Sequence, residues 1–206
     1  MDIITRRGPQ RMSQAEFTEL RGRYSSTLVD LGTGDGAWPR RFAREHGNVL
    51  AIGIDADRDA LRDAAKRAER KPARGGAPNA LYVAASAESL PSELQGAADW
   101  ITIYFPWAAL LRMILDGDPA LVVVLHHLSA PHARFSLVLN AEATPEGYSA
   151  PSPDSLRSAL ETPLASGQFR VATCDWIESS QAPATTWAGR LVKGSNRAIL
   201  GLDALR

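Results

Sequence analysis

The stretch Val29-Asp30-Leu31-Gly32-Thr33-Gly34-Asp35-Gly36 decides the fold of this chain. An apolar segment, 27–31, enters a glycine-rich turn, and a helical pattern follows it. Glycine allows positive φ angles and lets a ligand approach the bare backbone. Further along, Ile52-Gly53-Ile54-Asp55 ends the next apolar segment with an acidic side chain, which is placed to accept two ribose hydroxyls. Together the two segments predict a nucleoside-binding crevice at the mouth of a parallel sheet.

The spacing of these glycines differs from the dinucleotide-binding fingerprint. That fingerprint reads G-x-G-x-x-G, whereas residues 30–36 read D-x-G-x-G-x-G. The pattern resembles motif I of the class I S-adenosylmethionine (SAM) methyltransferases. This resemblance implies SAM as the cofactor and an α/β, Rossmann-like fold, in which a mainly parallel seven-stranded sheet carries helices on both faces.

Several side chains are candidates for the cofactor site. Asp30, at a strand end, is placed to hold the methionine amino group, directly or through water. In the stretch 84–91, Ala87 and Glu88 are placed to contact the edge of the adenine ring. Asp35 is a further candidate, although aspartate in a glycine turn often bonds only the local backbone. The candidate set for the cofactor is Asp30, Gly32, Gly34, Asp35, Asp55, Ala87 and Glu88.

Composition limits the class of protein. With 206 residues, of which 45% are hydrophobic, the chain can bury one core, so we expect a single domain over 1–206. No apolar run reaches membrane-spanning length and residues 1–7 lack a signal-peptide core, so we expect a cytoplasmic protein without a membrane partner. A monomer is a separate expectation. The lone Cys174 excludes an internal disulfide and a cysteine-based zinc site. A net charge of zero hides a basic segment between Arg62 and Arg74.

Apolar runs of strand length alternate with helical patterns, which is typical of right-handed βαβ units. The predicted strands are 27–31, 49–55, 81–85, 100–104 and 134–140, and the predicted helices are 40–46, 57–70, 107–115 and 119–128. Segments 169–177 and 197–202 are candidates for a final antiparallel pair. We expect residues 1–25 to form an N-terminal hairpin and helix, with a capping box from Ser13 to Glu16. Substrate-side linkers are predicted over 141–165 and 178–196.

The segment Tyr104-Phe105-Pro106-Trp107 is the predicted substrate side. Amino-group methyltransferases usually have (Asp/Asn)-Pro-Pro-(Tyr/Phe) here, and the leading residue accepts from the amine. This chain lacks that acceptor but keeps Trp107 to stack on a planar base, which favours a ring nitrogen whose lone pair is already free. A second aromatic, Trp187, lies in polar surroundings late in the chain. The alternative is that both tryptophans only fill the core.

Segments spread along nearly the whole chain resemble the 16S rRNA (adenine-1408, N1) methyltransferases that give aminoglycoside resistance. The matching segments are 17–20 with Tyr24, 30–36, Asp55, 71–79, 87–91, 105–107 and 187–191. The most discriminating of them are Lys71-Pro72-Ala73-Arg74-Gly75-Gly76 and the Pro106-Trp107 pair that Leu110-Leu111 follows. The resemblance implies N1 methylation of adenine 1408 in the decoding site of the 30S subunit, with resistance to kanamycin and apramycin.

The same resemblance implies a role for each substrate-side residue. Trp107 and Trp187 would sandwich a flipped adenine, while the Pro106 carbonyl would receive its N6 amino group. Arg190, with Thr185, would hold the backbone of the flipped nucleotide. The residues that would grip rRNA phosphates are Lys66, Arg67, Arg70, Lys71 and Arg197.

Two other functions remain open from the sequence. One is a SAM-dependent enzyme that methylates a small molecule of antibiotic biosynthesis, which the neutral net charge would suit. The other is a non-catalytic rRNA-binding module with a degenerate SAM fold, although the intact glycine turn and Asp55 speak against it. No metal is expected, because His126, His127 and His132 have no carboxylates at ligand spacing.

Overall fold

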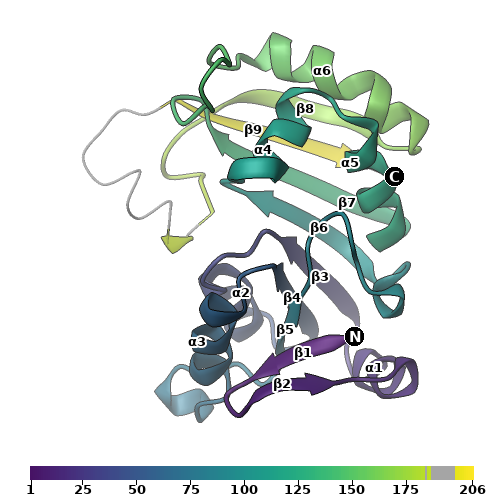
Figure 1. Cartoon of the computed structure of the whole chain (residues 1–206), viewed down its shortest axis with the longest axis vertical. Coiled ribbons are helices and arrows are strands. Elements are labelled where there is room, and N and C mark those ends of the chain that lie inside the picture. Colours follow the sequence, from purple (N-terminus) through teal and green to yellow (C-terminus); the bar gives the residue numbers. More distant parts are fainter. Residues whose placement is uncertain (184, 187–197) are drawn as a thin grey trace.

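The computed structural model describes residues 1–183, 185–186 and 198–206. Within them, nine strands form one sheet in the order β2-β1-β5-β4-β3-β6-β7-β9-β8 (Figure 1). The strands are β1 (Asp2–Thr5), β2 (Gly8–Arg11), β3 (Ser26–Leu31), β4 (Val49–Asp55), β5 (Ala80–Ala84), β6 (Ala98–Tyr104), β7 (Ser129–Asn140), β8 (Arg170–Ile177) and β9 (Ile199–Leu205).

The central strands β5, β4, β3, β6 and β7 pair in parallel, as the alternating pattern predicts. Residues Thr27 to Leu31 of β3 are all buried, which is typical of a parallel strand covered on both faces. Strands β4 and β5 lie on one side of β3, and β6 and β7 lie on the other side. The strand order therefore reverses at β3, directly after which the glycine turn begins.

Antiparallel strands extend the parallel core at both edges. The predicted N-terminal hairpin is confirmed, and β1 pairs with β5 through Ile3 and Val83, so β1 and β2 add to the seven predicted strands. At the other edge β9 runs antiparallel to β7 and to β8, which confirms the final antiparallel pair.

Helices cover both faces of the sheet, as expected from motif I (Figure 1). The longer helices are α1 (Gln14–Arg21), α2 (Ala37–Glu45), α3 (Arg58–Ala68), α4 (Ala108–Leu115), α5 (Pro119–Leu128) and α6 (Pro153–Ser166), and the short 3₁₀ helices are η1 (Pro72–Arg74) and η2 (Ser92–Leu94). In β4, Ile52 packs into the cluster that includes α4, α5 and α6, whereas its neighbour Ala51 packs against Phe42 of α2. The predicted capping box is present, since Ser13 and Glu16 bond each other's backbone N–H at the start of α1.

The predicted linker over 141–165 is wrong in its second half, because α6 begins at Pro153. Ser152 and Ser155 form a capping box at its N-terminus, and proline at the first helical position has no N–H to leave unsatisfied. Leu156, Leu160 and Leu164 recur every four residues and are buried, so one face of α6 packs on the core.

Candidate active site

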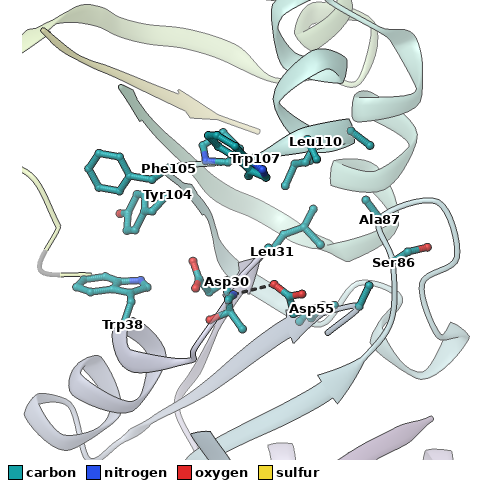
Figure 2. A pocket seen from close by; sticks show the side chains of 18 of the residues that line it. Asp30, Leu31, Trp38, Asp55, Ser86, Ala87, Tyr104, Phe105, Trp107 and Leu110 are labelled. Atoms are coloured by element: carbon teal, nitrogen blue, oxygen red, sulfur yellow. Dashed lines mark hydrogen bonds between the residues drawn. The ribbon is translucent and has the colours of Figure 1, made fainter. Parts of the chain in front are cut away.

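A pocket of about 420 Å³ opens where the carboxyl ends of β3, β4 and β6 meet (Figure 2). In α/β folds, ligands bind in the crevice at the point where the strand order reverses. The lining comes from the turn after β3, the ends of β4 and β5, the segment between β6 and α4, and Thr185 with Thr186. The predicted residues that line it are Asp30, Gly32, Gly34, Asp35, Asp55, Ala87, Glu88, Pro106, Trp107 and Thr185. The structure thus brings together ten candidates from distant parts of the chain.

The glycine turn is fixed by the neighbouring strand and by its own backbone. Gly32, Gly34 and Gly36 all have positive φ, and a Cβ on Gly36 would lie 2.4 Å from the Tyr82 ring. Asp55 accepts from the Gly34 N–H through Oδ2 at 2.7 Å and from the Asp57 N–H through Oδ1 at 2.9 Å. A carboxylate has about four acceptor sites, so Asp55 can hold the turn and still accept from a ligand.

Asp30 is a buried carboxyl at the bottom of the pocket. Its side chain is 3% exposed, and its Oδ1 accepts from the Thr102 hydroxyl at 2.7 Å. Burial raises the pKa of Asp30 to about 7, against the opposing effect of the Thr102 bond. A cationic group of a ligand would stabilise the ionised form, so this carboxyl suits an ammonium.

Asp35 contacts protein on both of its oxygens. Oδ1 accepts from the Ala37 N–H at 3.2 Å, and Oδ2 accepts from the Thr186 hydroxyl at 2.7 Å. Arg67 also approaches Oδ2, at 3.9 Å. The bond between Asp35 and Thr186 joins the glycine turn to a segment 151 residues away, directly before Trp187. The cofactor role of Asp35 stays a prediction.

Aromatic rings form one end of the pocket. In Figure 2, Trp38, Tyr104 and Phe105 lie on one side of Asp30, and Asp55, Ser86 and Ala87 lie on the other. The rings of Trp38 and Tyr104 meet edge to face at 5.3 Å. The indole Nε1 of Trp38 is buried and has no hydrogen-bond partner among the described residues. Trp38 is a pocket residue that is not among the candidates from the sequence; the available signal is its position two residues after Gly36, in the first turn of α2.

Trp107 lies in a segment with a strained backbone. Phe105 and Ala108 have φ of +53° and +49°, a region that residues with a Cβ rarely adopt. The Phe105 N–H donates to the Val138 carbonyl at 2.7 Å, which ties the segment to β7. The Trp107 side chain is 71% exposed, so the alternative that it fills the core is wrong. Strain of this kind persists where the surrounding structure imposes it, commonly at ligand sites.

The NpmA family model, described as 16S rRNA (adenine(1408)-N(1))-methyltransferase, matches residues 3–205. The chain belongs to this family. It is 35% identical over 193 residues to the 16S rRNA (adenine(1408)-N(1))-methyltransferase of Streptoalloteichus hindustanus, covering 90% of this chain and 89% of that one. The prediction of an rRNA methyltransferase is therefore confirmed. The two alternatives, a small-molecule methyltransferase and a non-catalytic rRNA-binding module, are not supported.

Solved structures agree with the NpmA-family assignment. The 16S rRNA methyltransferase KamB is 32% identical and superposes with a TM-score of 0.90, covering 100% of this chain and 99% of that one. A variant of the adenine-1408 methyltransferase from Catenulisporales acidiphilia, solved with its cosubstrate SAM, is 26% identical with a TM-score of 0.90, covering 100% and 96%. The class I methyltransferase fold predicted from motif I is confirmed.

In this NpmA-family enzyme the predicted phosphate contacts lie outside the pocket, on α3 and the turn after it. Lys66 pairs with Asp63 at 3.1 Å. Arg70 and Lys71 are exposed and form no ion pair with any described residue. A Cβ on Gly76 would lie 1.7 Å from the Arg70 carbonyl oxygen, so only glycine lets the chain fold back this tightly. Arg197, the fifth predicted phosphate contact, lies outside the described residues, as do Trp187 of the predicted base clamp and Arg190.

The histidines of α5 contact neighbouring groups of the protein. His127 Nε2 lies 3.0 Å from the Pro91 carbonyl oxygen, and His126 Nε2 lies 2.9 Å from an Arg206 nitrogen. The described residues contain no group of three or more His, Cys, Asp or Glu side chains that could hold a metal ion. Among those residues, no helix is long and apolar enough to cross a membrane.

Proposed function

We propose that this methyltransferase uses SAM to methylate N1 of adenine 1408 within the assembled 30S subunit, and holds the target base outside its helix between Trp107 and Trp187. The observation that carries the proposal is the exposed Trp107 on a strained segment at the rim of the pocket. A base inside a helix cannot present N1, because pairing and stacking bury that edge. An indole face replaces the lost stacking by roughly 1–3 kcal/mol per base.

The pocket fits SAM at both of its ends. The Asp30 carboxyl suits the ammonium of the methionine part, and the unpartnered Trp38 Nε1–H is a donor for its carboxylate. Asp55 retains acceptor sites for the ribose hydroxyls, while Ser86 and Ala87 leave room for a flat ring at the opposite end. When bound, SAM supplies a methyl group on a positively charged sulfur.

The chain's own residues position the base rather than activate it. The N1 lone pair of adenine is free at neutral pH, so no general base has to remove a proton before transfer. The Pro106 carbonyl, at the pocket rim, accepts from the N6 amino group and so orients the ring. The indole of Trp107 favours the positive charge that develops on the methylated ring, by roughly 0.5–2 kcal/mol. Catalysis then depends mainly on proximity and orientation.

Charge outside the pocket supports binding to rRNA. Arg70 and Lys71 are exposed beside η1, and such cations neutralise phosphates in a salt-dependent manner. The proposed set of phosphate contacts is Lys66, Arg67, Arg70, Lys71 and Arg197, and Thr185 with Arg190 would hold the flipped nucleotide. We infer a cytoplasmic monomer that acts on ribosomal subunits. A methyl group fixed on N1 in the decoding site would hinder aminoglycoside binding, so we infer resistance to kanamycin and apramycin.

The test is methyl transfer to 30S subunits, mapped by primer extension across the decoding site. Trp107→Phe keeps an aromatic face and should retain most activity, while Trp107→Ala should lose about ten- to a hundredfold without a lower melting temperature. Trp176→Ala is the matched control, because Trp176 is also an exposed tryptophan but lies on β8. Full methylation by a stable Trp107→Ala protein would refute the stacking role, and transfer to free RNA alone would refute the 30S substrate.

A further inference from the structure

Asn140 is a buried amide with one unused end. It is the last residue of β7 and is 6% exposed. Its Oδ1 accepts from the Glu142 N–H at 3.0 Å, whereas its Nδ2 has no hydrogen-bond partner among the described residues. A buried donor without a partner costs roughly 1–3 kcal/mol, and such groups in native proteins call for an explanation.

A second buried asparagine shows how this fold satisfies an amide with a structural role. Asn79 is 5% exposed, and its Nδ2 lies within 2.7 to 3.1 Å of the carbonyl oxygens of Ala43, His46 and Val49. Asn140 has the same burial but lacks these partners. The bond to Oδ1 gives the carbonyl end of the side chain a structural role. The Nδ2 end has no such role among the described residues.

Asn140 lines a small cavity beside the active site. The cavity holds about 50 Å³, and its lining residues are Phe105, Pro106, Trp107, Leu111, Leu139, Asn140 and Ala143. It is too small for a whole base. Residues 105–107 line both this cavity and the large pocket, so the two spaces are neighbours.

The chemistry of adenine matches this arrangement. On the purine the N6 amino group lies between two ring acceptors, N1 and N7. In the proposed function the Pro106 carbonyl accepts from N6, and N1 faces the large pocket. N7 would then lie on the opposite side of the amino group from N1, and Asn140 is the polar side chain that lines the neighbouring cavity. Because Oδ1 is already bonded, the free end of Asn140 is a donor, which is what N7 requires.

We propose that Asn140 is a substrate-binding residue whose Nδ2 donates a hydrogen bond to N7 of the target adenine. This inference rests on the proposed function. It assigns a third contact to the ring besides stacking on Trp107 and the bond to Pro106. Three contacts of different kind fix a planar ring in one orientation, which directs N1 toward the methyl donor.

The first experiment changes the substrate and leaves the protein intact. Reconstituted 30S subunits carry 7-deazaadenosine at position 1408, where a C–H replaces N7, or 3-deazaadenosine as the matched control, which keeps N7. One hydrogen bond corresponds to a loss of up to about tenfold in kcat/KM for the 7-deaza substrate, with little loss for the control. Removal of a ring nitrogen makes N1 more basic, so slower methylation cannot arise from a weaker nucleophile.

The second experiment combines that substrate with Asn140→Asp. Aspartate keeps the oxygen that accepts from the Glu142 N–H but turns an acceptor toward N7. We expect a loss of at least about tenfold on ordinary subunits, unchanged SAM binding by calorimetry, and partial recovery on the 7-deaza substrate. Equal rates of the unmodified enzyme on adenine and 7-deazaadenosine would overturn the role of Asn140 and leave the proposed function standing. Failure to methylate ordinary 30S subunits would instead refute the proposed function.

Discussion

Asp30→Asn should stabilise the free protein at neutral pH and weaken its hold on the cofactor. The carboxyl has an ordinary pKa of 3.8, and burial raises the pKa of Asp30 to about 7 in the folded chain. Below about pH 4 the group is protonated in both the folded and the unfolded chain. As the pH rises from about 4 to about 7, the unfolded chain releases this proton while the folded chain keeps it, so the free energy of unfolding falls.

The size of the effect follows from the two pKa values. A rise from 3.8 to about 7 corresponds to roughly 4 kcal/mol, at about 1.4 kcal/mol per unit. Asparagine has the same shape and can still accept from Thr102, but it does not ionise. The difference in stability between Asp30→Asn and the unmodified protein should therefore grow with pH and level off above about pH 7.

Urea unfolding of both proteins between about pH 5 and about pH 8 measures this difference directly. Thr102→Val removes a bond that favours the ionised form, so it should move the levelling point to higher pH. Calorimetry should show that SAM binds the unmodified protein more tightly as the pH rises through about 7, because the ammonium requires an ionised Asp30. A stability difference independent of pH would refute this reasoning, and unchanged SAM affinity in Asp30→Asn would remove Asp30 from the site.

Three further predictions concern the turn and the basic segment. Asp55→Ala removes the proposed acceptor for the ribose and the observed acceptor for the Gly34 N–H, so SAM binding should fall below detection in calorimetry while the protein stays folded in thermal melts. Joint reversal of Arg70 and Lys71 to Glu should weaken 30S binding with a shallower salt dependence and leave SAM binding intact; unchanged 30S affinity would mean that these side chains only face solvent. Gly76→Ala places a Cβ against the Arg70 carbonyl, so the melting temperature should fall, and an unchanged melt would contradict the tight turn.

Much of the fold was predictable because its signals are local. The glycine turn, the alternation of apolar runs and the capping box at Ser13 each occupy a few adjacent residues, and the structure confirms them. Helix α6 was missed because proline and serine at its start are also typical of loops, whereas its leucines are spaced for a helix. The length of β7 was underestimated since its first half, from Ser129, contains Pro131 and His132 at exposed positions.

The part of the candidate site that comes from the glycine-turn motif could be predicted from the sequence. Asp55 and the glycine turn follow each other closely in sequence, so their meeting could be inferred. The contact between Asp35 and Thr186 spans most of the chain, and no local pattern indicates it. The exposed position of Trp107 depends on two positive φ angles that an Ala or Phe in the sequence does not signal. The unpartnered amide of Asn140 is a property of packing, which becomes visible only in three dimensions.

The bond from Thr186 to Asp35 would link the binding of the cofactor to the binding of rRNA. Asp35 belongs to the turn that borders the cofactor pocket, and Thr186 directly precedes a proposed wall of the base clamp. A cofactor that fixes the position of Asp35 would also fix the position of Thr186, and this would favour rRNA binding. Linkage requires the reverse as well: the factor by which SAM tightens rRNA binding is the factor by which rRNA tightens SAM binding. The enzyme would then retain its methyl donor best on the ribosome, where the donor is used.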